Sequence, residues 1–300
     1  MGAGQERILR SRIKGVESTK KITRAMELIA ASQIVRAQSR IAGSRPYQEA
    51  VAKAVAEVAG EVGAKGARLL GTPTSPQSVA VVAVVADRGL CGGYNSAVLR
   101  TVERKFKAYQ SEGVEIHLFT VGKKAQSYFR YREIPVETNF VGMTDKPKFS
   151  DAEKISDALV NRFQNGEFDL VEIVSTRFIS AGTQKVGIAQ LLPLPESVKG
   201  ETQSGYRAMP ELEPEAVPLL AALLPQYLET SIFGALLEAS ASEHTARQRA
   251  MSSATENAEE LITDYTREMN RVRQEAITTE IMEIVGGAEA LRQAAAAERN

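Results

Sequence analysis

Apolar residues in the last part of the chain recur at a helical spacing over an unusual length. From Ala235 to Val285 there is no glycine and no proline, and these roughly fifty residues would form a helix about 75 Å long at 1.5 Å per residue. A compact domain of this chain length has a radius of gyration near ~20 Å, so such a helix must project from it. The pattern therefore predicts a long helix from about Tyr227 to Val285 that needs a partner for its apolar side.

A heptad-like seam runs along this helix. Its positions alternate spacings of three and four residues and are Leu237, Ala241, His244, Gln248, Met251, Thr255, Ala258, Ile262, Tyr265, Met269, Val272 and Ala276. Few of them are Leu or Ile; the many small residues permit close helix approach but bury little area, which at about 25 cal/mol per Å² gives modest stability. Two interpretations stay open: an ordinary helix of a bundle, or a stiff two-helix rod that another protein contacts.

The first sixty residues also have a helical pattern. We predict a helix over residues 5–60, with a bend or break where Gly43 is followed by Arg45 and Pro46. Its apolar stripe begins with Leu9 and widens between residues 22 and 35 to more than one face. A helix that is apolar on two sides packs against two neighbours, one of which could be the last helix.

The middle of the chain changes character. Residues 78–86 form a continuous run rich in valine, which is typical of a strand buried on both faces of a parallel sheet. Strand and helix patterns then alternate, which predicts a small α/β layer domain. The predicted strands lie at 78–86, 114–121, 136–140, 169–177 and 184–192, and the predicted helices at 96–111, 123–130 and 151–164.

These elements predict an α/β fold in which long N- and C-terminal helices form an antiparallel coiled coil and a Rossmann-like α/β domain is inserted between them. The expected boundaries are an N-terminal coiled-coil helix at 1–60, a linker at 61–77, the α/β domain at 78–195, a loop at 196–218 and the C-terminal coiled-coil helix at 219–300.

The net charge of zero conceals an uneven distribution. Residues 1–45 hold ten basic and three acidic side chains, about +7, and residues 229–300 hold thirteen acidic and seven basic ones, about −6. The two helices could attract each other, or the basic one could face an acidic partner. Nucleic acid is the other common partner of a basic patch, but no nucleic-acid-reading motif accompanies this one, so we expect none. No apolar run reaches the roughly 18 residues that span a bilayer, so we expect no transmembrane segment.

The glycine loop at residues 89–93 is the main candidate for chemistry. A strand, this loop and a helix could cradle phosphate at the helix N-terminus, yet the dinucleotide and P-loop patterns are both absent, which favours a plain tight turn. Cys91, the single cysteine, is expected to be buried and structural, and Asp87 and Arg88 to form a local ion pair or cap. With two histidines and no nucleophile–base pair, we expect no catalytic, cofactor or metal site.

Six stretches resemble the γ subunit of bacterial F-type ATP synthase, in family order and over nearly the whole chain. They are residues 19–33 (TKKITRAMELIAASQ), 44–47 (SRPY), 87–95 (DRGLCGGYN), 190–195 (QLLPLP), 241–247 (ASEHTAR) and 274–287 (QEAITTEIMEIVGG). The resemblance implies a rotor that couples proton flow through the membrane c ring to ATP synthesis and hydrolysis on the β subunits. It also implies one copy per complex, the α, β, ε and c subunits as partners, and a peripheral place on the cytoplasmic face of the plasma membrane.

The resemblance also assigns roles at matching positions. Lys21 and Met26 match the first-helix region that meets an acidic lever of β. Gln274, Thr278 and Glu280 match the last-helix region that contacts β, and Glu243 and Arg247 match a coupling segment on the same helix. Tyr206 lies in a variable loop that in the family faces the c ring. The alternative to a rotor is a nucleotide-dependent α/β enzyme with a helical arm, which would bind nucleotide alone and lose binding on Gly92→Val.

Overall fold

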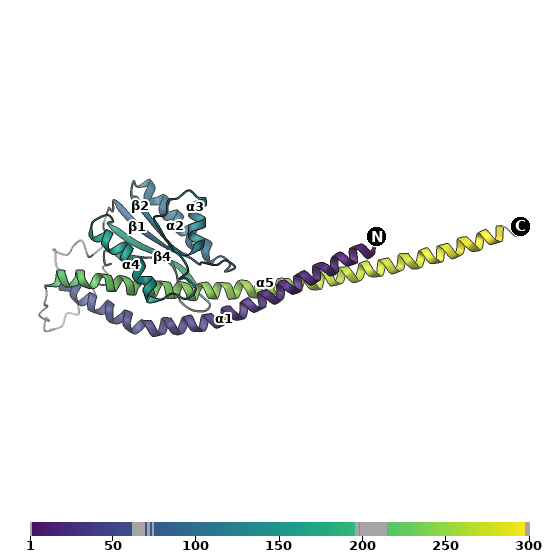
Figure 1. Cartoon of the computed structure of the whole chain (residues 1–300), viewed down its shortest axis with the longest axis horizontal. Helices are drawn as coiled ribbons and strands as arrows, with labels where there is room; N and C mark the ends of the chain where they lie inside the picture. Colours follow the sequence, from purple (N-terminus) through teal and green to yellow (C-terminus); the bar gives the residue numbers. More distant parts are fainter. Residues whose placement is uncertain are drawn as a thin grey trace. The chain divides into compact units, whose positions relative to one another are not determined.

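The computed structural model describes residues 2–61, 70, 73, 75–195, 198 and 215–297. Five helices and five strands carry the described chain (Figure 1). In order they are α1 (Gly2–Glu61), β1 (Ser78–Val84), α2 (Tyr94–Ser111), β2 (Glu115–Val121), α3 (Lys123–Tyr131), β3 (Thr138–Phe140), α4 (Phe149–Gln164), β4 (Leu170–Phe178), β5 (Gln184–Leu192) and α5 (Ala216–Ala297). Each strand and helix expected from the sequence is present, and all but the last helix lie within a few residues of their predicted ends.

The chain divides into two compact units. Unit 1 holds residues 1–28 and 250–300, and unit 2 holds residues 29–249. Both long helices run through the boundary, so each unit contains part of α1 and part of α5.

Unit 2 is built on a five-stranded sheet in the order β3-β2-β1-β4-β5. Strands β2, β1 and β4 are parallel, β3 pairs parallel to β2, and β5 pairs antiparallel to β4. Alternate residues of β1 face opposite sides: Val79 and Val81 pack with α2 and α3, whereas Ala80 and Val82 pack with α1, α4 and α5. The valine-rich run is thus a central strand buried on both faces, as the sequence predicted.

The N-terminal part of α5 is the core helix of unit 2. Leu220, Leu224, Leu228 and Ile232 are fully buried at a spacing of four residues and belong to the same cluster as the sheet. The sequence predicted no segment long and apolar enough to cross a membrane. Within the described residues, however, α5 contains an 18-residue window with a mean hydropathy of 1.3 that meets this criterion. The core helix of a soluble protein passes the same test, and these four residues of the segment are packed in the core.

Two helix boundaries differ from the expectations. The sequence predicted a bend or break near Gly43 and Pro46; the break is not present, since α1 runs unbroken to Glu61. Helix α5 begins at Ala216, earlier than position 219 or 227, and continues through Pro225. A proline inside a helix removes one backbone hydrogen bond, but tertiary packing supplies most helix stability in proteins, and here both segments pack into the core.

Unit 1 is an antiparallel pair of helical segments. The seam predicted on α5 is confirmed within it: Met251, Thr255, Ala258 and Val272 are buried. On the facing helix the buried positions include Leu9, Thr23 and Glu27. The Thr23 and Thr255 hydroxyls are hydrogen bonded at 2.8 Å, and Lys20 forms an ion pair with Glu259 at 2.9 Å. The basic first helix and the acidic last helix therefore do attract each other at this level.

The buried threonine pair leads to a stability prediction. Replacing Thr255 by valine is expected to lower the unfolding free energy of unit 1 by about 0.5–1.5 kcal/mol, because the hydroxyl contact across the seam is lost while the Thr23 hydroxyl keeps its hydrogen bond to the Lys20 carbonyl oxygen at 3.0 Å. The double variant Thr23→Val/Thr255→Val should lose less than the sum of the two single variants, since each single variant already removes the shared contact. Urea unfolding followed by circular dichroism measures all four members of this cycle. Strictly additive losses would show that the two hydroxyls contribute independently.

Candidate coupling site

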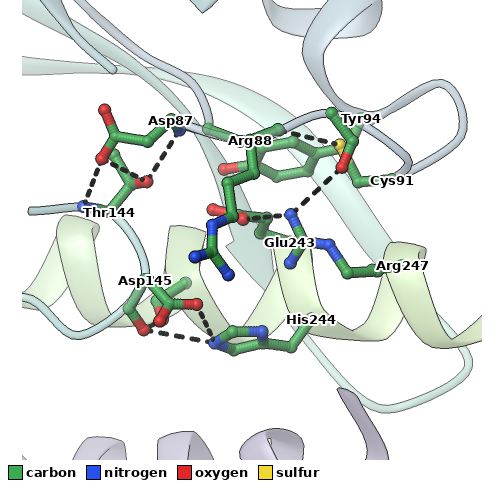
Figure 2. Close-up of polar contacts among 12 residues, drawn as sticks. Asp87, Arg88, Cys91, Tyr94, Thr144, Asp145, Glu243, His244 and Arg247 are labelled. Atoms are coloured by element: carbon green, nitrogen blue, oxygen red, sulfur yellow. Dashed lines mark hydrogen bonds and ion pairs between the residues drawn. The ribbon is translucent and has the colours of Figure 1, made fainter. Parts of the chain in front are cut away.

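The loop between β1 and α2 is organised by the Asp87 carboxylate. Its Oδ1 accepts a hydrogen bond from the backbone N–H of Lys123 at 3.1 Å. Its Oδ2 accepts from the N–H of Gly142 at 3.0 Å, from the N–H of Thr144 at 3.3 Å and from the Thr144 hydroxyl at 3.1 Å (Figure 2). Asp87 therefore joins three loops at the carboxyl end of the parallel strands. The sequence predicted a local ion pair or cap; Asp87 instead bonds to groups 36 to 57 positions away, and no ion pair to Arg88 is present among the described contacts.

The glycine loop is the tight turn that the sequence favoured. Leu90 and Gly92 adopt positive φ angles of 61° and 55°, and the Tyr94 N–H donates to the carbonyl oxygen of Cys91 at 3.2 Å. The Cys91 side chain is buried, as expected of a structural cysteine, and burial raises the pKa of its thiol. Leu90 is 63 % exposed although it occupies a strained conformation for a branched residue.

A buried ion pair on α5 faces this loop. Arg247 donates to Glu243 Oε1 at 2.6 Å and to the Gly89 carbonyl oxygen at 3.4 Å, so it ties the loop to the helix (Figure 2). Both side chains are almost completely buried, with 2 % of Glu243 and 8 % of Arg247 exposed. Burial raises the pKa of Glu243, and the Arg247 charge opposes that shift. These two predicted site residues are therefore brought together, with a shared structural role.

His244 and Tyr94 complete the buried polar network. His244 Nε2 lies 3.2 Å from the Asp145 carbonyl oxygen, and burial lowers the pKa of its imidazole. The Tyr94 hydroxyl donates to the carbonyl oxygen of Ala239 on α5 at 3.2 Å, and burial raises the pKa of that phenol well above its usual value. His244 is thus a packed helix residue, as predicted from its place on the seam.

The remaining predicted residues lie on the helices of unit 1. Lys21 is exposed and Met26 is half-buried on α1, and Gln274, Thr278 and Glu280 are all exposed on α5. The Thr278 hydroxyl donates to the carbonyl oxygen of Gln274 at 2.9 Å, a local helix contact. Lys21 lies level with residues near position 257 of α5, so Gln274 is about 25 Å farther along at 1.5 Å per residue. The structure therefore does not join these two groups, and Tyr206 lies outside the described residues.

Sequence reasoning missed two features of the site. The four hydrogen bonds of the Asp87 carboxylate could not be found, because their donors are three backbone N–H groups and one hydroxyl from segments distant in sequence. The contact of Arg247 with the Gly89 carbonyl was missed for the same reason. The available signal was positional: Asp87 directly follows a buried strand, where residues from neighbouring parallel strands converge.

Comparison with known proteins covers nearly the whole chain. A protein-family model described as ATP synthase matches residues 5–291. An ATP synthase gamma chain of Parafrankia sp. (strain EAN1pec) is 46 % identical, with 98 % of this chain and 100 % of that protein covered. An ATP synthase gamma chain of Clavibacter sepedonicus is 45 % identical over 97 % of this chain and 99 % of that protein.

Solved structures agree in fold. The central stalk and c-ring structure of the Tetrahymena thermophila mitochondrial ATP synthase contains a chain that is 26 % identical, with a TM-score of 0.58, covering 78 % of this chain and 99 % of that one. A chain of the Euglena gracilis mitochondrial ATP synthase has a TM-score of 0.67 at 17 % identity, over 96 % and 95 % of the two chains, and supports the fold alone. Full-length identity above 40 % to bacterial relatives, together with this fold, shows that the chain belongs to the ATP synthase gamma-chain family.

Proposed function

We propose that this chain is the rotating central-stalk subunit of a bacterial F-type ATP synthase. It couples proton flow through the membrane c ring to ATP synthesis and hydrolysis at the β subunits. The observation that carries the proposal is the full-length similarity to bacterial ATP synthase gamma chains. In this role the chain is a non-catalytic subunit, one copy per complex, and ATP chemistry belongs to β. Its partners are α, β, ε and the c ring, and its place is the cytoplasmic face of the plasma membrane.

The helical pair of unit 1 supplies the physical means of coupling. A rod can transmit rotation to surrounding subunits only if it is stiff and its surface is not rotationally symmetric. The Thr23–Thr255 and Lys20–Glu259 contacts fix the two helices against each other. Exposed apolar side chains remain on both helices, among them Ile22 and Leu28 of α1 and Ile277 and Ile281 of α5. We assign the contacts with β to Lys21, Met26, Gln274, Thr278 and Glu280, and a coupling role on the same last helix to Glu243 and Arg247. Tyr206 is assigned to the c ring.

Reconstitution tests this proposal directly. Purified α and β subunits are combined with and without this chain, and complex formation and ATPase activity are measured. We expect this chain to co-purify with α and β and to change the ATPase rate of the complex. A stable ATPase complex that forms without this chain and does not respond to its addition would disprove the rotor assignment.

A charge substitution at Met26 tests one assigned contact. Met26→Lys places a third cation near Lys21 and Arg24, and the resulting repulsion or wrong ion pair with β misaligns the contact at a cost of about 1–3 kcal/mol. We expect assembly to be preserved and proton-driven ATP synthesis to fall relative to ATP hydrolysis. The matched control is Met26→Leu, which keeps the apolar volume. Unchanged proton-driven synthesis in Met26→Lys would remove Met26 from the set of contact residues.

A further inference from the structure

The Glu243 carboxylate is only half satisfied. Its Oε1 accepts the hydrogen bond from Arg247 at 2.6 Å, but within the described part of the chain its buried Oε2 has no hydrogen-bond partner. The side chain is 2 % exposed, so solvent does not supply the missing bond. A buried carboxylate oxygen without a partner is costly, and the cost falls when the group takes up a proton.

The charges around Glu243 come from every element packed against it. Arg247 and the neighbouring His244 lie on α5 itself (Figure 2). The loop after β1 contributes Asp87, Arg88 and Cys91. Tyr94 comes from α2, and Asp145 comes from the loop before α4. Arg247 is the one buried cation of this set, whereas Asp87 and Asp145 both add negative potential at Glu243. The environment therefore opposes a full negative charge at this position.

We propose that Glu243 is a proton-binding site of unit 2, whose carboxyl group takes up a proton on Oε2 and thereby weakens the ion pair that orients the Arg247 guanidinium toward the loop at residues 87–93. A neutral carboxyl group accepts a weaker hydrogen bond from a guanidinium group than a carboxylate does. Arg247 also holds the Gly89 carbonyl oxygen, so the state of Glu243 reaches the loop at residues 87–93. Proton binding by Glu243 therefore makes the contact between this loop and Arg247 of α5 dependent on pH.

The direction of the pH dependence follows from linkage. Burial raises the pKa of Glu243 in the folded chain above the ordinary value of 4.5, so the folded state holds this proton more tightly than the unfolded state. Stability therefore falls as pH rises from 4.5 to the folded-state pKa, by up to about tenfold in the folding equilibrium constant per pH unit. Above the folded-state pKa the stabilising contribution of Glu243 protonation is fully lost, and below pH 4.5 it is fully present.

The test compares the full-length chain with Glu243→Gln across pH. Cys91 is the single cysteine and is buried beside the site, so its labelling by a thiol reagent during urea titration reports local unfolding there. We expect the urea midpoint of wild type to fall relative to Glu243→Gln as pH rises from 4.5. Glu49 is an exposed glutamate of α1 in the same unit, so Glu49→Gln is the matched control. Its urea midpoint should differ from that of wild type by the same amount at every pH.

A difference in urea midpoint between wild type and Glu243→Gln that does not change with pH would overturn the proposal. So would a wild-type midpoint that rises relative to Glu243→Gln as pH rises. The second result would mean that Glu243 stays ionised and that its pair with Arg247 stabilises the fold. If Glu243→Gln does not fold, Arg247→Met serves instead, because removal of the cation should extend the pH-dependent loss to higher pH. An unchanged pH profile in Arg247→Met would likewise count against proton binding at Glu243.

Discussion

Replacing Gly122 by alanine is expected to destabilise unit 2 by about 3–5 kcal/mol, from left-handed strain of 1–3 kcal/mol and overpacking of a similar size. Gly122 joins β2 to α3 with a φ of 101°, and a Cβ atom placed there would lie 2.3 Å from the carbonyl oxygen of Val85. The backbone of Val85, directly after the central strand β1, cannot move away as the end of a flexible side chain could. Urea unfolding of the full chain, read by Cys91 labelling, measures the loss.

The variant Gly113→Ala separates backbone strain from the steric overlap of the added Cβ atom. Gly113 has a φ of 76°, but an added Cβ there meets no atom within 4 Å. The unfolding free energy of this control should fall only by the cost of a positive φ angle for alanine, about 1–2 kcal/mol. Equal losses in the two variants would mean that the chain relaxes around position 122, and that the close approach to Val85 is not decisive.

Replacing Asp87 by alanine is expected to cost about 3–4 kcal/mol, because hydrogen bonds to a charged group contribute roughly 1.5–3 kcal/mol each and do not add fully. The substitution leaves the N–H groups of Lys123, Gly142 and Thr144 without this acceptor. Lys123 begins α3, whereas Gly142 and Thr144 lie in the loop before α4, so we expect both segments to loosen together. Hydrogen exchange at the three amides provides the measurement.

The Asp87→Asn variant tests whether the charge matters. Asparagine keeps one acceptor oxygen and the side-chain shape but turns the other oxygen into a donor. We expect an intermediate loss, with protection retained at the amides that face the remaining oxygen. Full protection of all three amides in Asp87→Ala would contradict the role assigned to the carboxylate.

Much of the fold could be predicted because its pattern is local. The valine-rich run at residues 78–86 identified the central strand, and the three-four spacing from Met251 to Val272 identified the buried side of α5. The errors also have a local cause. Pro46 and Pro225 usually end helices, but the sequence pattern does not weigh the lost hydrogen bond against burial of Val55 or Leu224 in the core.

The candidate site was harder to predict because its contacts join distant segments. Glu243 and Arg247 lie four residues apart on one helix, so their pairing is visible in the sequence. Their burial is not, since it depends on a loop that lies more than 150 positions earlier in the chain. The coupling roles of Gln274, Thr278 and Glu280 came from family resemblance, and all three are exposed in the isolated chain.

The unequal lengths of the two helices in unit 1 have a mechanical consequence. All side chains from Ile277 to Arg292 are exposed, and α5 continues past the N-terminus of α1 as a single helix (Figure 1). One helix resists twisting less than two helices that are hydrogen bonded and ion paired across a seam. Under an applied torque, elastic twist therefore collects in the unpaired segment, which acts as a torsion spring in series with the stiffer pair.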